Sequence, residues 1–308
     1  MKAKHSGKSI RFLVVAAAVI ALLSMAWFFY VKPKMADILF EPIFVNDVKK
    51  IRLVSEMRVK LNASVEAEKS AVMADTDEAS RAYADQALSL SAEVEEARSE
   101  LGVLIEAEKM GRDVDLFREF STCWERFRQV DQELLSLSVL NTNLKASELS
   151  FDSARNAIKH LEKSLDDVIN SDVAYDKSCK IERLSHRVLT AALRIHALQS
   201  PHIAESRPEK MDEIETTIQT QDALINQSLD ALSFLMNPKS KPLVEAAKAA
   251  HAEFWRINTE VMKLSRQNTN VLSLAMSLGQ KRKVTVLCQD VLSALEKSIQ
   301  SKVYKATR

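Results

Sequence analysis

Apolar residues of this chain recur mostly at the period of an α-helix. One stripe, with members spaced alternately three and four residues apart, is Phe127, Val130, Leu134, Leu137, Asn141 and Leu144. That spacing is the pattern of a coiled-coil seam. Extended backwards, it predicts one helix of about 38 residues over 112–149. A helix of this length is stable only when it packs against neighbouring helices.

The same stripe occurs a second time, 127 residues later in the sequence. There it consists of Phe254, Ile257, Val261, Leu264, Asn268 and Val271. The segments LSVLNTN at 137–143 and LSRQNTN at 264–270 are identical at five of seven positions. Because both the spacing and the residues are kept, we interpret the chain as two copies of one helical unit.

Helix boundaries are few, because the chain contains only 4 Gly and 6 Pro. This scarcity also disfavours a fold of strands and tight turns. Breaks are expected at 74–78, 109–113 and 150–153 in the first copy, and at 200–208, 237–242 and 278–279 in the second. Each copy then has four helices with short connections, as in an up-down-up-down bundle.

The connection between the two copies has two interpretations. The polar stretch 170–172 favours a break. However, the segment 152–200 contains no Gly or Pro, so a single helix could also run from the first copy into the second.

An apolar run near the N-terminus predicts a membrane anchor. Residues 12–31 are uncharged, and 20 helical residues span the roughly 30 Å of a bilayer core. Trp27 and Tyr30 lie at its outer end, and the preceding tail is rich in Lys and Arg, which orients the N-terminus towards the cytoplasm. A signal peptide cleaved after Ala26 is the alternative, although the run is longer than a usual signal core.

These patterns together predict an all-α protein with one N-terminal transmembrane helix followed by two tandem antiparallel four-helix bundles. The predicted parts are a cytoplasmic basic tail at 1–11, the transmembrane helix at 12–31, and bundles at 34–172 and 173–303. Since no comparable apolar run follows, we expect a single-pass protein of the bacterial inner membrane with its bulk in the periplasm.

Composition excludes several classes of function. Lys and Arg number 43 against 42 Asp and Glu, and the charges are interspersed, so nucleic acid is not an expected partner. Cys123, Cys179 and Cys288 lie far apart without His residues at ligand spacing, so no metal site is predicted. We find no nucleophile with a paired base and no phosphate-binding loop, and therefore predict neither an enzyme nor a cofactor.

Polar residues within the two stripes are the first candidates for a site. Asn141 and Asn268 take positions where apolar residues are expected, and a buried Asn without partners costs about 1–3 kcal/mol. One hypothesis is that Asn141, Asn143, Asn268 and Asn270 contact a ligand. The alternative is that they pair with neighbouring helices and determine the register of packing.

Two arginines are the second candidates. Arg187 and Arg194 lie seven residues apart and therefore on the same flank of a helix. They could hold a carboxylate between helices, because a guanidinium binds carboxylates through two hydrogen bonds. The alternative is ordinary solvated charge on a helix surface.

The order of these features resembles a known family. A basic tail, one anchor helix, LNASVEAEKSAVMADTDEAS at 61–80 and LSVLNTNLKASELSFDSAR at 137–155 are similar to the four-helix-bundle ligand-binding domain of bacterial methyl-accepting chemotaxis receptors. The resemblance covers 10–170, with 183–300 as a diverged second copy, an arrangement similar to helical bimodular sensor domains. It implies a sensor of small organic ligands. The second membrane helix, the HAMP relay and the cytoplasmic signalling region of that family have no counterpart here, so a membrane signalling partner is expected.

We therefore expect a membrane-anchored extracytoplasmic sensory protein, forming a homodimer through its long helices. A small helix shift would carry the signal. The rival function is a structural or scaffolding envelope protein whose bundles act as a spacer and an interaction surface. A sensor should contain a pocket with converging polar groups, whereas a spacer should be packed shut.

Overall fold

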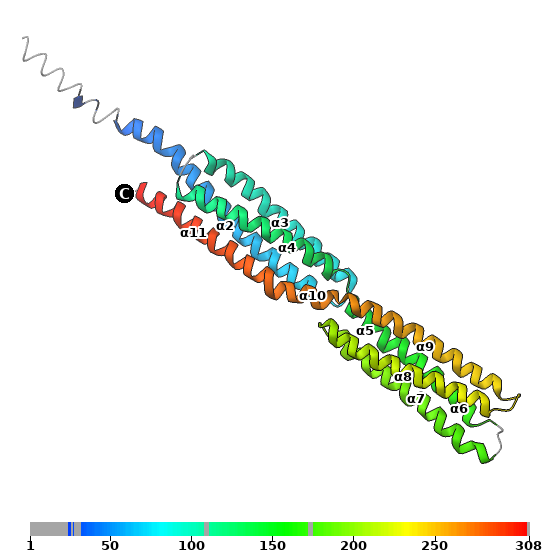
Figure 1. The fold of residues 1–308 in the computed structure, drawn as a ribbon. Coiled ribbons are helices and arrows are strands. Elements are labelled where there is room, and N and C mark those ends of the chain that lie inside the picture. Colours follow the sequence, from blue (N-terminus) through cyan, green and yellow to red (C-terminus); the bar gives the residue numbers. More distant parts are fainter. Residues whose placement is uncertain (1–23, 26, 28–31, 108–110, 172–174, 307–308) are drawn as a thin grey trace, which may run out of the picture. The chain divides into compact units, whose positions relative to one another are not determined.

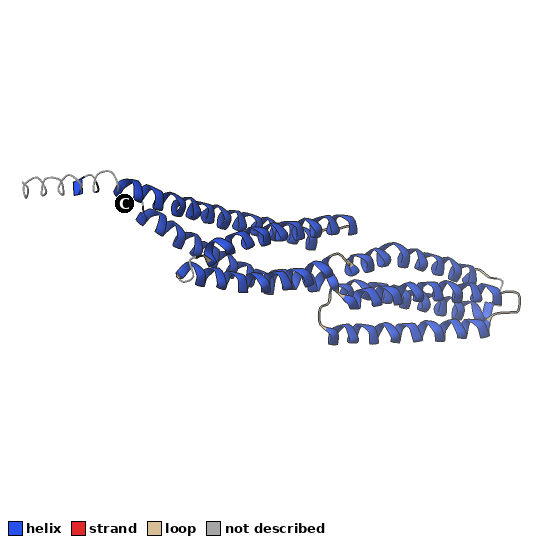
Figure 2. Ribbon diagram, turned by 90° about the horizontal axis from the view of Figure 1, so that it is seen from above, coloured by secondary structure: helices blue, strands red, loops and turns tan. Residues whose placement is uncertain are grey.

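The computed structural model describes residues 24–25, 27, 32–107, 111–171 and 175–306, which are almost entirely helical. Figures 1 and 2 show helices and connecting loops, and no strand occurs in this described part. The all-α prediction is thus confirmed. The predicted transmembrane helix at 12–31 lies mostly outside the described residues, and within those residues no helix combines the length and apolarity needed to span a membrane.

The helices follow one another along the chain with short connections. Their bounds are α2 Lys32–Met73, α3 Asp77–Glu106, α4 Arg112–Ser138, α5 Thr142–Glu148, η2 Leu149–Ala154, α6 Arg155–Ile169, α7 Tyr175–Ala204, α8 Pro208–Leu235, α9 Lys241–Gln267, α10 Thr269–Met276, η3 Ser277–Lys281 and α11 Arg282–Ala306. The two η elements are π-helical turns that continue directly into the helices after them.

Several predicted breaks are confirmed. Between α2 and α3 the hydroxyl of Thr76 accepts a hydrogen bond of 3.1 Å from the backbone N–H of Ala79, which caps the new helix. Breaks also occur near 109–113 and 237–242. Since α6 ends at Ile169 and α7 begins at Tyr175, the alternative of one continuous helix between the copies is wrong.

Two other boundaries differ from the prediction. The helix expected over 112–149 ends at Ser138, and Asn141 has a left-handed backbone with φ of 51°. Asn268 has the same conformation, with φ of 54°. Asn tolerates this region better than most residues with a side chain. The breaks expected at 150–153 and 278–279 are instead the π-helical turns η2 and η3. A π turn adds one residue to the helix and shifts the apolar stripe, so the sequence pattern resembles the start of a new helix.

Backbone contacts divide the chain into two compact units that do not match bundles at 34–172 and 173–303. Unit 1 comprises 1–61, 91–124 and 287–308, and unit 2 comprises 62–90 and 125–286. Most of α11 therefore belongs with the N-terminal part of α2. The breaks at Asn141 and Asn268 both lie inside the continuous segment 125–286 of unit 2, and this segment stands in the sequence between 91–124 and 287–308 of unit 1.

Unit 1 is built from parts of α2, α3, α4 and α11 around an apolar core. Its fully buried members include Leu53, Met57, Leu61, Leu101, Ile105, Phe120, Trp124, Leu295 and Ile299. Trp124 also donates its indole N–H to Glu95 at 2.7 Å. A Cβ atom at Gly102 would lie 3.0 Å from the ring of Phe117, so glycine permits this close packing.

Unit 2 contains α6, α7, α8 and α9, which lie side by side around a second core (Figure 1). Its buried members include Ile158, Leu161, Val188, Ile195, Ile225, Leu229, Val244, Phe254 and Val261. The two Asn-Thr-Asn segments are in this unit as well.

Candidate functional site

The two helix breaks lie directly against each other within unit 2. The backbone N–H of Thr142 donates to the hydroxyl of Thr269 at 3.2 Å, and the N–H of Thr269 donates to the hydroxyl of Thr142 at 3.2 Å. The two hydroxyl oxygens are 3.2 Å apart. We call residues 141–143 and 268–270 together the joint.

Asparagine side chains complete the joint in the same reciprocal manner. Asn143 N–H donates to Asn270 Oδ1 at 3.1 Å, and Asn270 N–H donates to Asn143 Oδ1 at 3.2 Å. Asn143 Nδ2 donates to Asn268 Oδ1 at 2.8 Å, and Asn270 Nδ2 donates to Asn141 Oδ1 at 3.0 Å. The first N–H groups of α5 and α10, which a helix cannot satisfy internally, are thus capped by the opposite copy.

The joint is also bonded to other helices of unit 2. Asn141 Nδ2 donates to Asp77 at the start of α3 at 3.0 Å, and Asn268 Nδ2 donates to the carbonyl of Glu205 after α7 at 3.0 Å. Lys145 and Asn141 together hold the pKa of the Asp77 carboxyl below its usual value, the Lys145 contact being the larger cause. A displacement of α7 or α3 would therefore act on the joint.

The four asparagines predicted as ligand contacts are brought together by the fold. Asn141 is 1% exposed and Asn268 is 5% exposed, and their side chains bond within the protein. This is the register-determining arrangement that was the alternative hypothesis. Contact of these residues with a ligand stays a prediction.

The two predicted arginines are not brought to the joint. Arg187 and Arg194 are exposed on α7, and neither forms an ion pair with any residue that the structure describes. This placement favours solvated surface charge, the alternative interpretation of the sequence.

A buried chain of polar side chains, which was not predicted from the sequence, begins in η2. Ser150 donates its hydroxyl to Gln199 Oε1 at 2.7 Å, and Gln199 Nε2 donates to Asn258 Oδ1 at 2.9 Å. All three residues are buried. The signal that could have revealed this chain is the 127-residue repeat, which pairs Ser150 with Ser277 and Asn258 with Asp131.

The equivalent cluster at η3 is charged instead, because Asp131 stands where the other copy has Asn258 and Lys281 ends η3. Lys281 forms an ion pair with Asp131 and lies 3.2 Å above the ring of Phe127. Glu68 is 1% exposed beside them, and neither of its carboxylate oxygens has a well-aligned hydrogen-bond donor in the described part of the chain. Burial raises the Glu68 pKa, while the nearby Ser277 hydroxyl and Lys281 ammonium oppose this shift.

Replacing Glu68 with Gln should stabilise the protein at neutral pH by about 1 kcal/mol. Because the folded-state pKa of Glu68 is raised, its stability penalty develops as pH rises above the unfolded-state value of 4.5. The gain should therefore be present at pH 7 and absent at pH 4 or below, as measured by urea unfolding. Exposed Glu66, changed to Gln, is the control. An equal effect of Glu68→Gln at both pH values would contradict this prediction.

A third cluster connects α7, α8 and α9. His202 Nδ1 lies 2.7 Å from the Ser265 hydroxyl, and His202 Nε2 lies 3.0 Å from Glu215. Burial lowers the His202 pKa, with Glu215 opposing. The connectivity is that of a hydrolytic triad, but Ser265 is 0% exposed and also lies 3.0 Å from the His202 carbonyl. A substrate cannot reach this hydroxyl, so the cluster holds helices together.

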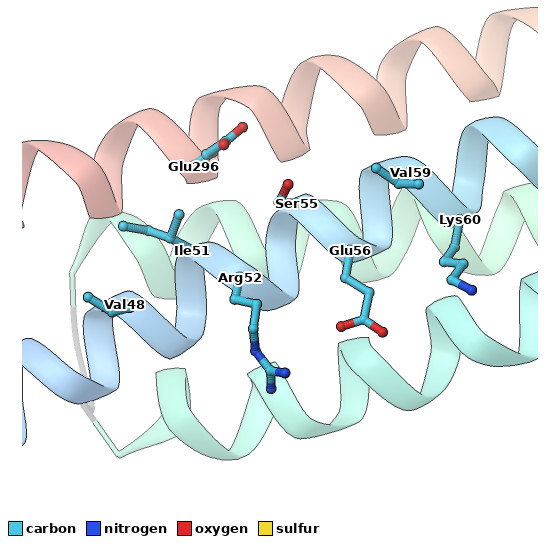
Figure 3. A pocket seen from close by; sticks show the side chains of 8 residues that line it. All are labelled: Val48, Ile51, Arg52, Ser55, Glu56, Val59, Lys60 and Glu296. Atoms are coloured by element: carbon cyan, nitrogen blue, oxygen red, sulfur yellow. The ribbon is translucent and has the colours of Figure 1, made fainter.

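Unit 1 has a surface groove of about 540 Å³ between α2 and α11. It is lined by Val48, Ile51, Arg52, Ser55, Glu56, Val59, Lys60 and Glu296. In Figure 3 Arg52, Glu56 and Lys60 point away from α11, so its wall near α11 is mainly apolar. Glu296 is paired with Arg58 at 2.5 Å. This groove has an apolar wall but no convergent polar groups.

Unit 2 has a smaller groove of about 260 Å³ between α8 and α9. It is lined by Glu215, Ile218, Gln219, Trp255, Asn258, Thr259, Met262, Lys263 and Arg266. Unlike the groove of unit 1, it combines an aromatic wall with a buried amide, which is the composition typical of a small-molecule site.

Comparison with solved structures finds a similar fold in the sensor domain of the histidine kinase sensor TorS from V. parahaemolyticus. The TM-score is 0.53 at 12% sequence identity, and the match covers 84% of this chain and 99% of that chain. At this identity the likeness concerns the fold alone, so the expected similarity to a helical sensor domain is supported at that level and not for chemotaxis receptors specifically. No family model and no curated protein sequence matches the chain.

Proposed function

We propose that this protein is a membrane-anchored extracytoplasmic sensor that acts as a homodimer and passes its signal to a membrane partner. The observation that carries the proposal is the joint, in which two helix breaks 127 residues apart are bonded reciprocally. A sensor of this kind needs an element through which a small movement of one helix changes its neighbours. The fold shared with a solved sensor domain supports the same conclusion.

The joint can transmit a movement because it connects four helix ends. On one side α4 and α9 end, and on the other α5 and α10 begin. Since each break is capped by the opposite copy, neither helix can shift along its axis without moving the other. A ligand that displaced α9 would consequently act on α10 and α5 together.

The test is thermal unfolding of the purified full chain with succinate, aspartate, putrescine and related acids, amino acids and amines. A compound that binds the folded state raises the unfolding midpoint. With a binder, hydrogen exchange at 137–145 and 264–272 should change, because the joint senses the bound state. In Asn268→Ala the same compound should bind while the exchange response weakens.

Two outcomes would oppose the sensor proposal. A saturating ligand that leaves exchange at the joint unchanged would exclude transmission through it. No midpoint shift for any compound would favour the rival function, an envelope scaffold. The proposed location is tested separately by fusing alkaline phosphatase after residue 308, which is active only outside the cytoplasm.

A further inference from the structure

The groove between α8 and α9 contains an amide that lacks one of its partners. Asn258 is 1% exposed at the base of the groove, and its Oδ1 accepts a hydrogen bond from Gln199 at 2.9 Å. Its Nδ2 donates to no residue that the structure describes. This nitrogen is not one of the fully buried side-chain atoms without a partner, so it is reached from the groove, and water or a ligand there supplies its acceptor.

The buried chain behind Asn258 determines which group faces the groove. Ser150 donates to Gln199 Oε1, so Gln199 presents its N–H group to Asn258. Asn258 must then use its oxygen on Gln199 and direct its N–H group elsewhere. In the other copy the equivalent residue is Asp131, which meets Lys281 and has no amide donor to offer.

The walls of the groove indicate what the acceptor is attached to. Trp255 and Met262 are half-buried and pack against the core of unit 2, leaving an apolar surface on the groove side. The volume of about 260 Å³ lies just below the roughly 300–1,000 Å³ of pockets for drug-sized ligands. A single ring or a short aliphatic body fits this size.

Charges around the groove are already paired. Glu215 is held by Arg266 at 2.7 Å and by His202 at 3.0 Å, and Arg266 also pairs with Asp212. Lys263 is 3.5 Å from Glu260. Arg266 is thus paired with two carboxylates, and Lys263 is largely exposed to solvent, so a neutral ligand is favoured over an ionised one.

We propose that this groove binds a small neutral carbonyl compound, such as a primary amide or a ketone on a planar or short apolar body. Its oxygen accepts the Asn258 Nδ2 hydrogen, and its apolar body lies on Trp255 and Met262. This inference names a ligand class for the proposed sensor, but the binding itself does not depend on the sensor function.

Three probes on one ring test the class of ligand. Benzamide, benzoate and benzylamine share the phenyl group and differ in carrying a neutral, anionic or cationic head at pH 7. With the full chain, saturation-transfer NMR should detect benzamide with a Kd of about 1 mM, as expected for a fragment. Benzoate and benzylamine should bind at least about tenfold more weakly. Equal or tighter binding of either charged probe overturns the proposal.

Two variants test the site. Asn258→Asp keeps the acceptor for Gln199 but replaces the free donor, and should weaken benzamide binding about tenfold. Trp255→Ala removes the apolar wall at a half-buried position on the edge of the core, and should do the same. Asn156→Asp, on the exposed face of α6, is the control and should bind as the parent does. Unchanged binding in Trp255→Ala overturns the proposal even when Asn258→Asp fails to fold.

The result also separates this site from the sensor function. Benzamide binding that depends on Asn258, without altered hydrogen exchange at the joint, would leave the site in place and count against transmission. Absence of benzamide binding, with another compound altering exchange at the joint, would count against the carbonyl site and leave the proposed transmission in place.

Discussion

Replacing Asn268 with Ala is expected to lower the free energy of unfolding of the full chain by about 3–4 kcal/mol. Its φ of 54° lies in the left-handed region, which costs Ala about 1–2 kcal/mol. The change also removes the acceptor for Asn143 Nδ2 and the donor to the Glu205 carbonyl, each contributing about 1 kcal/mol. Urea unfolding followed by circular dichroism measures the loss.

Two companion variants separate backbone strain from hydrogen bonding. Asn268→Gly adopts the left-handed region without strain and should be about 1 kcal/mol less destabilising than Asn268→Ala. Asn156→Ala, on the exposed face of α6, should change stability by less than about 0.5 kcal/mol. If Ala and Gly at position 268 proved equal, strain would not contribute, and if both matched the parent, the joint would not be a source of stability.

Replacing Lys281 with Met is expected to destabilise the protein by about 3–5 kcal/mol at pH 7. Lys281 is 1% exposed, and the change removes the cation that faces Asp131 while Glu68 stays buried nearby. Removing one partner of a buried ion pair leaves the other charge in a medium that solvates it poorly. The loss should shrink at acidic pH, because burial raises the Glu68 pKa and protonation of this carboxyl removes one of the two buried negative charges.

The other copy of the repeat supplies the rescue variant. Positions 154 and 258, equivalent to 281 and 131, hold Ala and Asn in a neutral chain with Gln199. Lys281→Ala combined with Asp131→Asn should therefore recover most of the stability that Lys281→Ala alone loses. If the double variant were as unstable as the single one, the cost would come from lost packing over Phe127 rather than from the unpaired charge.

The candidate site was only partly predictable from sequence. The repeated Asn-Thr-Asn segments marked the right residues, because polar side chains in an apolar stripe need partners. Their reciprocal pairing across 127 residues could not be read from periodicity, which reports the face of a helix and not its neighbour. Arg187 and Arg194 were predicted as a carboxylate site from their spacing. Both are exposed on α7, which favours solvated surface charge. The polar clusters at Lys281 and Asn258 depend on contacts between distant helices and left no local signal.

What the sequence determined by itself was the helical character of the chain, its two copies and the caps and breaks that depend on nearby residues, such as Thr76 before α3. These follow from local periodicity and hydrogen bonding within one turn. Only the tertiary structure decided that Asn141 and Asn268 interrupt helices without reversing the chain, and hence that α11 packs in unit 1 with α2. The left-handed backbone at each break is stabilised by hydrogen bonds from the other copy, so its location depends on partners far away in the sequence.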